Sequence, residues 1–242
     1  MSNTTSKMKV EIWSDIMCPF CYIGKRNLES ALEEFPDAEN VEVEWHSFQL
    51  DPGIESGHGK NLYQYLSERK GLSLEQSIHM HQQVTERARR AGLEYNFDKA
   101  VVANSFDAHR VIQLAKSKGL GDAAEERLFY AYFTEGKDFS DHETLVQLGI
   151  NIGLDEAETR QVLTGNAYAD KVEQDISEAQ HIGIRGVPFF VFDRKYAVSG
   201  AQPVDVFVNT LQQSFTEWQK NNPAVNLEIT AGAVCTPGEE CK

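Results

Sequence analysis

Two cysteines three positions apart are the strongest chemical signal in this sequence. Cys18 and Cys21 lie in the stretch CPFC, where a strand-like run over residues 8–14 gives way to a helical pattern. Pro19 is favoured at a first helical position, because its missing N–H would be unpaired there in any case. Cys18 is therefore predicted to be the N-cap of this helix, with its sulfur facing the free N–H groups of the first turn.

This placement predicts different roles for the two thiols. The positive end of a helix dipole favours thiolate, so the pKa of Cys18 is expected to fall from about 8.5 into the range of roughly 3.5–7.5. Cys21 lies almost one turn further on, within reach of a mixed disulfide formed at Cys18. We therefore predict that Cys18 is the nucleophile and Cys21 the resolving thiol.

The surrounding pattern predicts a β–α–β opening, a helical block and a β–β–α ending. Half-buried or short strands are predicted over residues 8–14, 41–48, 187–192 and 195–200. Residues 59–183 show helical spacing, with a capping box at Ser73–Gln76. Pro203 is predicted to begin the last helix. These elements place the cysteine pair between the first strand and its helix.

Three segments carry a resemblance to a known family, namely SDIMCPFCYIGK, NSFDAHR and GIRGVPFFVFDRKYAVSGAQ. With them the sequence resembles the DsbA-like branch of the thioredoxin superfamily, especially its FrnE-type thiol–disulfide oxidoreductases. The resemblance implies an α/β, thioredoxin-like fold with a large all-helical insertion. The expected domains are a discontinuous thioredoxin-like domain (8–58 and 183–221), the helical insertion (59–182) and an irregular tail (222–242).

The same resemblance implies a substrate-binding role for two residues near the second half of the sheet. Pro188 matches the family's cis-proline, which faces the cysteine pair, and X–Pro bonds adopt cis far more readily than other peptide bonds. The backbone of Val187 is expected to pair with an extended substrate segment, as in strand addition. Without the cysteine motif, Pro188 would be interpreted as an ordinary edge-strand proline.

Many relatives also carry a buried acid on the first strand, which transfers the proton of the resolving thiol. That position falls near Ile12, beside Glu11, whereas Asp15 lies closer to the cysteines. The sequence leaves open whether either carboxylate has this role. Asp15 is equally well explained as a turn residue.

A second pair, Cys235 and Cys241, closes a short loop over a Pro-Gly turn. It is either an accessory redox pair that exchanges with Cys18–Cys21, or a passive disulfide or two idle thiols in the tail.

Four cysteines could also bind zinc. An N-cap cysteine suits zinc poorly, however, and the resemblance places a proline where a metal would lie, so we predict no metal. The histidines lack metal spacing and are expected at the surface or in a satisfied core: His46, His79, His81, His109 and His142.

Composition narrows the classes of partner. The 242 residues are 41% hydrophobic and carry 37 acidic against 23 basic side chains, a net charge of −14. Such a surface would repel a nucleic-acid backbone, and no Lys/Arg cluster offsets it. No apolar run approaches the roughly 20 residues of a membrane helix, and the polar N-terminus does not resemble a secretory signal. We therefore expect a cytoplasmic protein without nucleic-acid or membrane partners.

The expected activity is thiol–disulfide exchange on protein or peptide substrates, with no cofactor beyond the redox-active cysteine pair. A reducing or oxidising partner such as thioredoxin or glutathione would complete the cycle. Whether the protein works as oxidase, reductase or isomerase depends on its reduction potential, and a cytosolic setting favours reductase or isomerase. The alternatives are a glutathione-dependent isomerase or transferase of the same fold, and a non-catalytic peptide-binding or chaperone module.

Overall fold

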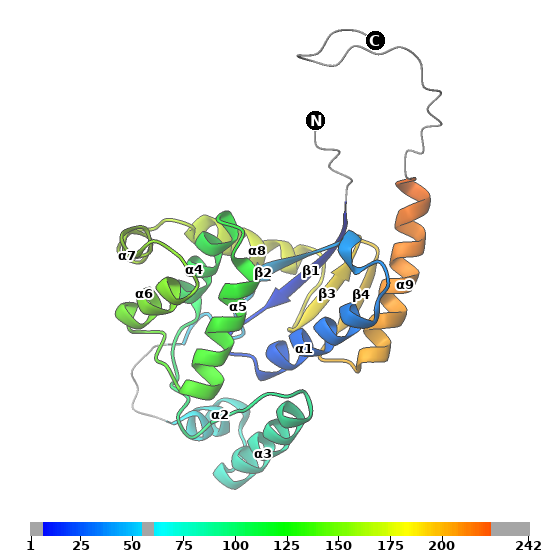
Figure 1. The fold of residues 1–242 in the computed structure, drawn as a ribbon. Helices are drawn as coiled ribbons and strands as arrows, with labels where there is room; N and C mark the ends of the chain where they lie inside the picture. Colours follow the sequence, from blue (N-terminus) through cyan, green and yellow to red (C-terminus); the bar gives the residue numbers. More distant parts are fainter. Residues whose placement is uncertain (1–6, 55–60, 224–242) are drawn as a thin grey trace, which may run out of the picture.

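A computed structural model describes residues 7–54 and 61–223. Its centre is a four-stranded mixed sheet in the order β2-β1-β3-β4, with helices on both faces (Figure 1). The strands are β1 (Met8–Ser14), β2 (Val41–Ser47), β3 (Phe189–Phe192) and β4 (Tyr196–Ser199). β1 runs parallel to β2 and antiparallel to β3, and β3 and β4 form the expected hairpin.

The helices account for the rest of the described architecture. They are α1 (Pro19–Glu34), α2 (Leu62–Lys70), α3 (Leu74–Arg90), α4 (Phe106–Ser117), α5 (Gly121–Tyr130), α6 (His142–Asn151), α7 (Glu156–Thr164), α8 (Ala169–His181) and α9 (Val204–Asn221), with a 3-10 turn at Ala38–Asn40 and a π-helical turn at Ala131–Glu135. The capping box at Ser73 and Gln76 is confirmed at the start of α3. Pro203 is the N-cap of α9 rather than its first helical residue. None of the described helices is long and apolar enough to span a membrane.

The sheet is buried on both faces. Val10 and Ile12 of β1 pack into one core with residues of α1 and α9. Trp13 points to the opposite face, where it packs with Ala179 of α8. The prediction that β1 is half-buried is therefore wrong, because α8 covers the side that the alternating pattern assigned to solvent.

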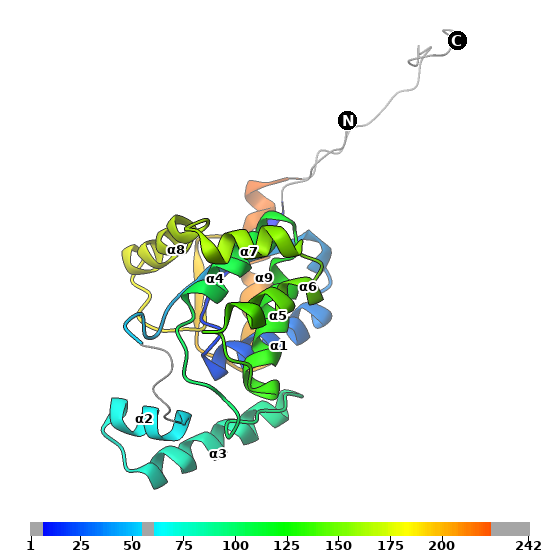
Figure 2. The ribbon, with the colours of Figure 1, turned by 90° about the vertical axis from the view of Figure 1, so that its left-hand side faces the viewer.

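The helical segment between β2 and β3 packs against the start of α1. Its largest apolar core contains Cys18 and Cys21 together with side chains of α3, α4 and α5. Figures 1 and 2 show α2 and α3 side by side at one end of the molecule, next to α1 and apart from α6, α7 and α8. The expected α/β fold with a helical insertion is confirmed, and the domain limits at residues 58, 182 and 221 stay predictions.

Candidate active site

The cysteine pair lies at the first turn of α1. Cys18 is the N-cap, with extended backbone angles (φ −90°, ψ 112°), and Pro19 is the first helical residue, as predicted. The chain reaches this position through a turn in which the Cys18 N–H donates to the carbonyl of Asp15 at 2.8 Å. The Cys18 thiol, however, makes no hydrogen bond to the amides of the first turn. It donates instead to the Val187 carbonyl, with the sulfur 3.5 Å from the oxygen.

The Val187–Pro188 peptide bond is cis, as predicted, whereas the roles of Pro188 and Val187 toward a substrate stay predictions. The Pro188 carbonyl accepts a hydrogen bond of 2.8 Å from the Gly200 N–H, which ties this turn to the end of β4. Gly24 of α1 lies against the proline: a Cβ at Gly24 would be 3.1 Å from Pro188 Cγ and 3.0 Å from Phe190 Cζ. The missing side chain at Gly24 therefore lets α1 approach the Val187–Pro188 turn closely enough for the Cys18 contact.

The two thiols have different surroundings, although both are buried and neither forms a disulfide. Cys18 lines a hollow that opens toward α2 and α3, whereas Cys21 is not among the residues that line it. Burial raises the pKa of Cys21 well above its ordinary value, and the neighbouring Cys18 raises it further. Cys18 and not Cys21 therefore borders this hollow, and the raised pKa of Cys21 favours its protonated thiol form.

Tyr95, in the segment that follows α3, holds the start of α1 in place. Its hydroxyl donates to the Pro19 carbonyl at 2.7 Å, and its ring stacks on Phe133 at a centroid distance of 4.6 Å. Burial raises the pKa of Tyr95 well above its ordinary value, and the nearby Cys18 adds to the shift. This neutral hydroxyl connects the helical insertion to the cysteine turn.

The two carboxylates left open by the sequence lie in different places. Asp15 is buried in the turn before Cys18, and its oxygens accept the N–H groups of Met17 (3.2 Å) and Leu50 (2.8 Å). Glu11 pairs with the guanidinium of Arg194, and its carboxylate lies 3.4 Å from the His46 ring. The interpretation of Asp15 as a turn residue is confirmed by these bonds, and a proton-transfer role for it stays a prediction.

Behind Asp15 lies a buried cluster of ionisable groups that the sequence did not reveal. His109 Nε2 is 3.6 Å from Asp15 Oδ1, and neither ring nitrogen of His109 has a hydrogen-bond partner among the described residues. Burial lowers the pKa of His109, but the Asp15 carboxylate outweighs it and raises the pKa above its usual value. Burial raises the pKa of nearby Glu125 to about 7. His109 is therefore a core histidine, as one of the two expectations has it, but its ring nitrogens lack, among the described residues, the hydrogen bonds that were expected with it.

Several Arg and Lys side chains line the hollow at the cysteine end of α1. The hollow that contains Cys18 has a volume of about 980 Å³ and lies between α1 and the α2–α3 pair. Its basic lining residues are Arg69, Lys70, Arg87 and Arg90. These four residues lie in two separate helices, so they do not form a Lys/Arg cluster along the sequence. In the sequence, the positive charge of this hollow is visible only as basic residues in the last turns of α2 and α3.

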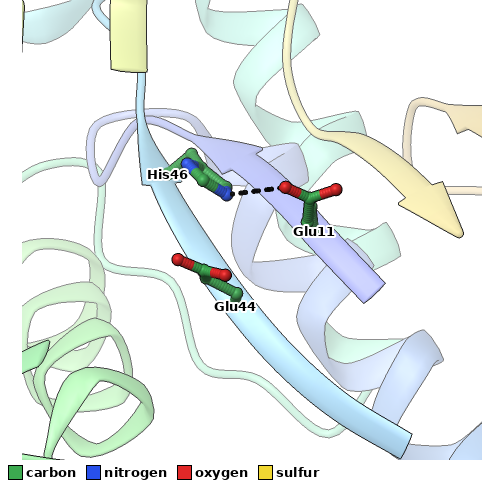
Figure 3. A group of neighbouring side chains, drawn as sticks. All are labelled: Glu11, Glu44 and His46. Carbon is green, nitrogen blue, oxygen red and sulfur yellow. Dashed lines mark ion pairs between the residues drawn. The ribbon is translucent and has the colours of Figure 1, made fainter. Parts of the chain in front are cut away.

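A third polar group lies on the other side of the sheet, between β1 and β2. Figure 3 shows Glu11 and Glu44 on neighbouring strands with His46 beside them, and their ligand atoms lie within 4.8 Å of one another. Such a set could hold a cation, but Arg194 pairs with Glu11 and Lys9 lies 3.0 Å from Glu44. Side-chain cations thus neutralise the carboxylate charges, so this group fits an ion-pair network better than a metal centre.

The second cysteine pair, Cys235 and Cys241, lies outside the residues that the structure describes.

Comparisons with known proteins agree with this architecture. The model of the DSBA-like thioredoxin domain matches residues 9–212. A crystal structure of the probable DsbA oxidoreductase SCO1869 from Streptomyces coelicolor is 38% identical, with a TM-score of 0.83 and coverage of 97% of this chain and 98% of that one.

Two further proteins extend the comparison. The uncharacterized protein YwbO of Bacillus subtilis is 29% identical over 82% of this chain and 92% of its own length. The cytosolic disulfide reductase DsbM of Pseudomonas aeruginosa, also solved with GSH, shares the fold at 18% identity, with a TM-score of 0.61 and coverage of 86% of this chain and 99% of that one. The expected thioredoxin-like fold is confirmed, and the chain belongs to the DsbA-like thioredoxin-domain family of thiol–disulfide oxidoreductases.

Proposed function

We propose that this protein exchanges thiols and disulfides in protein or peptide substrates through Cys18 and Cys21, most readily as a reductase or isomerase. The observation that supports this most directly is the contact of 3.5 Å between the Cys18 sulfur and the Val187 carbonyl. This contact joins the accessible thiol to the backbone next to the cis-proline. A substrate strand that paired with Val187 would bring its own sulfur to Cys18.

In the reductive direction the Cys18 thiolate attacks one sulfur of a substrate disulfide. The substrate S–S bond breaks, a mixed disulfide forms, and the first substrate sulfur leaves and takes up a proton. Cys21 then loses its proton and attacks the Cys18 sulfur, which releases the second substrate thiolate and leaves Cys18 and Cys21 as a disulfide. Two electrons from a thiol partner such as thioredoxin or glutathione restore the dithiol, and the reaction requires no further cofactor.

The raised pKa of Cys21 supports this division of roles. A resolving thiol that stays protonated does not compete for substrate, and it must lose its proton only once the mixed disulfide exists. Asp15 is a buried carboxylate in the turn just before Cys18, so we propose it as the group that facilitates this proton loss. We place the reaction in the cytoplasm, as the name of the fold relative DsbM states for that protein.

The test is a set of cysteine variants with a disulfide-linked peptide substrate. Cys21→Ser is expected to accumulate a stable mixed disulfide with the peptide, seen by mass spectrometry, because nothing resolves it. Cys18→Ser is expected to form no adduct and to lose turnover. A Cys235→Ser/Cys241→Ser double variant serves as the control, and a redox titration of Cys18–Cys21 with and without the tail pair shows whether the two pairs exchange.

The opposite results would replace the proposal. Glutathione-dependent isomerase or transferase activity that survives Cys18→Ser would indicate the alternative enzyme class. Peptide binding that persists in the Cys18→Ser/Cys21→Ser variant, with no exchange by the wild type, would indicate a non-catalytic binding module.

A further inference from the structure

The cysteine end of α1 opens into two adjoining hollows. The larger one, of about 980 Å³, is lined by Cys18, and the smaller one, of about 690 Å³, by Pro188. Both are lined by Phe20, Arg87 and Val187. The two hollows therefore form one cleft that passes the nucleophilic sulfur and the substrate-pairing backbone.

This cleft carries positive charge in a strongly acidic protein. The larger hollow is lined by four cations, Arg69, Lys70, Arg87 and Arg90, and by the carboxylate of Glu86. Arg69 pairs with Asp51, and Arg90 lies 3.5 Å from Glu86. Within residues 7–54 and 61–223, Arg87 and Lys70 have no carboxylate partner, whereas the whole chain has a net charge of −14. Two unpaired cations thus face the space in front of Cys18.

Arg87 contacts the redox motif directly. Its guanidinium lies 5.6 Å from the ring centroid of Phe20, the residue inside CPFC, which is a cation–π distance. Arg87 also lines both hollows, so its donors can reach a ligand on either side of Cys18. A planar guanidinium with several N–H donors binds carboxylates in a defined geometry, and an ammonium adds an unspecific attraction.

We propose that the cleft selects extended peptide segments whose cysteine is flanked by acidic side chains, with Arg87 and Lys70 binding the flanking carboxylates. This inference rests on the proposed thiol–disulfide exchange and adds its substrate class. Electrostatic attraction also predicts faster encounter with such peptides and a loss of the preference at high salt.

The experiment uses three disulfide-linked homodimers of a short peptide, with Glu, Gln or Lys at the two positions on each side of its cysteine. Reduced full-length protein is mixed with each dimer for a single turnover, and released peptide thiol is measured by chromatography after acid quenching. Each peptide dimer accepts two electrons and two protons from Cys18 and Cys21, which become a disulfide, so a single turnover needs no added reductant. Each rate is divided by the rate of the same dimer with dithiothreitol alone, which removes the intrinsic reactivity of the peptide.

The wild type is expected to reduce the Glu dimer about tenfold faster than the Gln dimer in low salt, and the Lys dimer slowest. The ratio of Glu to Gln rates should fall toward one in 0.5 M salt, at roughly a 4 Å screening length. In an Arg87→Gln/Lys70→Gln variant the ratio should be close to one even in low salt. Because the ratio compares two peptides on one protein, a change in Cys18 reactivity cancels.

The matched control removes two charges elsewhere. Lys171 and Lys220 are exposed, and neither lines the two hollows. Their replacement by Gln should leave the Glu-to-Gln ratio at its wild-type value. Equal normalised rates for the Glu and Gln dimers in the wild type, or a preference that survives in Arg87→Gln/Lys70→Gln, would overturn the charge selectivity while the exchange reaction stands. Failure of all three dimers to react would contradict the proposed function itself.

Discussion

Two groups of buried polar side chains lie near β1, one around Asp175 and one around Glu125, and the central carboxylates of the two groups differ in their hydrogen-bond partners. On the α8 side, Asp175 lies 3.0 Å from His46 Nδ1 and accepts N–H groups from Ser47 and Gln113. Glu11 in the same group is paired with Arg194. On the cysteine side, His109 and one oxygen of Glu125 have no hydrogen-bond partner among the described residues.

The contrast separates groups that stabilise the fold from groups placed near the chemistry. A buried charge that has charged and hydrogen-bonded partners stays ionised. Removing one partner is destabilising, because it leaves the remaining charge buried in a low dielectric without compensation. A buried carboxyl without such partners, as at Glu125, costs stability, and burial raises its pKa so that the neutral form is favoured. The second pattern is the one that active sites show, and here it lies next to the turn that carries Cys18 and Cys21.

The largest expected change in stability follows from a substitution in the buried group beside α8. Asp175→Ala should lower the free energy of unfolding by about 3–5 kcal/mol, because His46 and the Ser47 and Gln113 donors lose their buried acceptor. The rate of thiol exchange by the folded variant should stay close to that of the wild type. Urea unfolding and single-turnover peptide reduction measure the two quantities.

Glu178 gives the matched control for this change. It also lies on α8, at 2.5 Å from Arg194, but this pair is partly exposed. Glu178→Ala should therefore cost less than about 1 kcal/mol. An Asp175 variant as stable as the Glu178 variant would show that the buried network does not hold α8 on the sheet.

The second prediction concerns the pH dependence of stability that the buried Glu125 causes. The folded-state pKa of Glu125 is about 7, above its ordinary value, because the side chain is buried. Between these two values the folded state binds more protons than the unfolded state, so stability falls as pH rises through this window. Glu125→Gln removes this loss, and its stability advantage over the wild type should grow between pH 5.5 and 8 toward about 3 kcal/mol.

Glu126, the next residue, is expected to behave in the opposite way. Burial raises its pKa, but hydrogen bonds from Arg26 and Tyr22 outweigh burial and lower it. This carboxylate stabilises the fold above its ordinary pKa, so Glu126→Gln should lose stability at neutral pH. Urea titrations of both variants at several pH values give the comparison, and a pH-independent gap for Glu125→Gln would refute an unusual ionisation there.

The smallest effect on stability is expected at the contact between α1 and the proline turn. Gly24→Ala places a methyl group against Pro188 and Phe190, and crowding of this kind costs about 1–3 kcal/mol. Alanine's better helix propensity returns about 1 kcal/mol, so the net loss should be about 1 kcal/mol. Single-turnover exchange should slow by roughly threefold to tenfold, because Cys18 and Val187 no longer lie at their native separation.

Gly149→Ala is the control for this position, since Gly149 lies in α6, where a Cβ would be 3.2 Å from Thr159 Cγ2. It introduces similar crowding away from the cysteines, so it should alter stability without altering the exchange rate. Equal slowing in both glycine variants would indicate a global effect rather than a local one at the active site.

Much of the architecture could be read from local patterns. The strands predicted over residues 8–14 and 41–48, the proline at position 19 and the capping box at Ser73 each depend on neighbours within a few positions, and each appears in the structure, with the second strand ending at Ser47. The cis bond at Pro188 followed from the family resemblance rather than from the local sequence. Short-range signals of this kind are reliable because the backbone geometry that they describe is itself short-range.

The remaining features depend on which segments meet in space. The hydrogen-bond partner of Cys18 is a carbonyl in a segment 169 positions away. The burial of Glu11 depends on α8 and on Arg194. The position of His109 beside Asp15, with no hydrogen bond from its ring to the part of the chain that the structure describes, depends on packing that no spacing along the chain encodes. The cations of the cleft come from two helices whose separation in sequence concealed their common surface.

The sequence by itself therefore determined the secondary structure around the cysteines, the cysteine motif and the order of the β–α–β and β–β–α segments. The tertiary structure decided which thiol is accessible, which carboxylate lies near it, and which charges face the cleft. The physical reason is that burial and electrostatic interaction depend on distance through space, and the helical insertion sets these distances only when it packs on the start of α1.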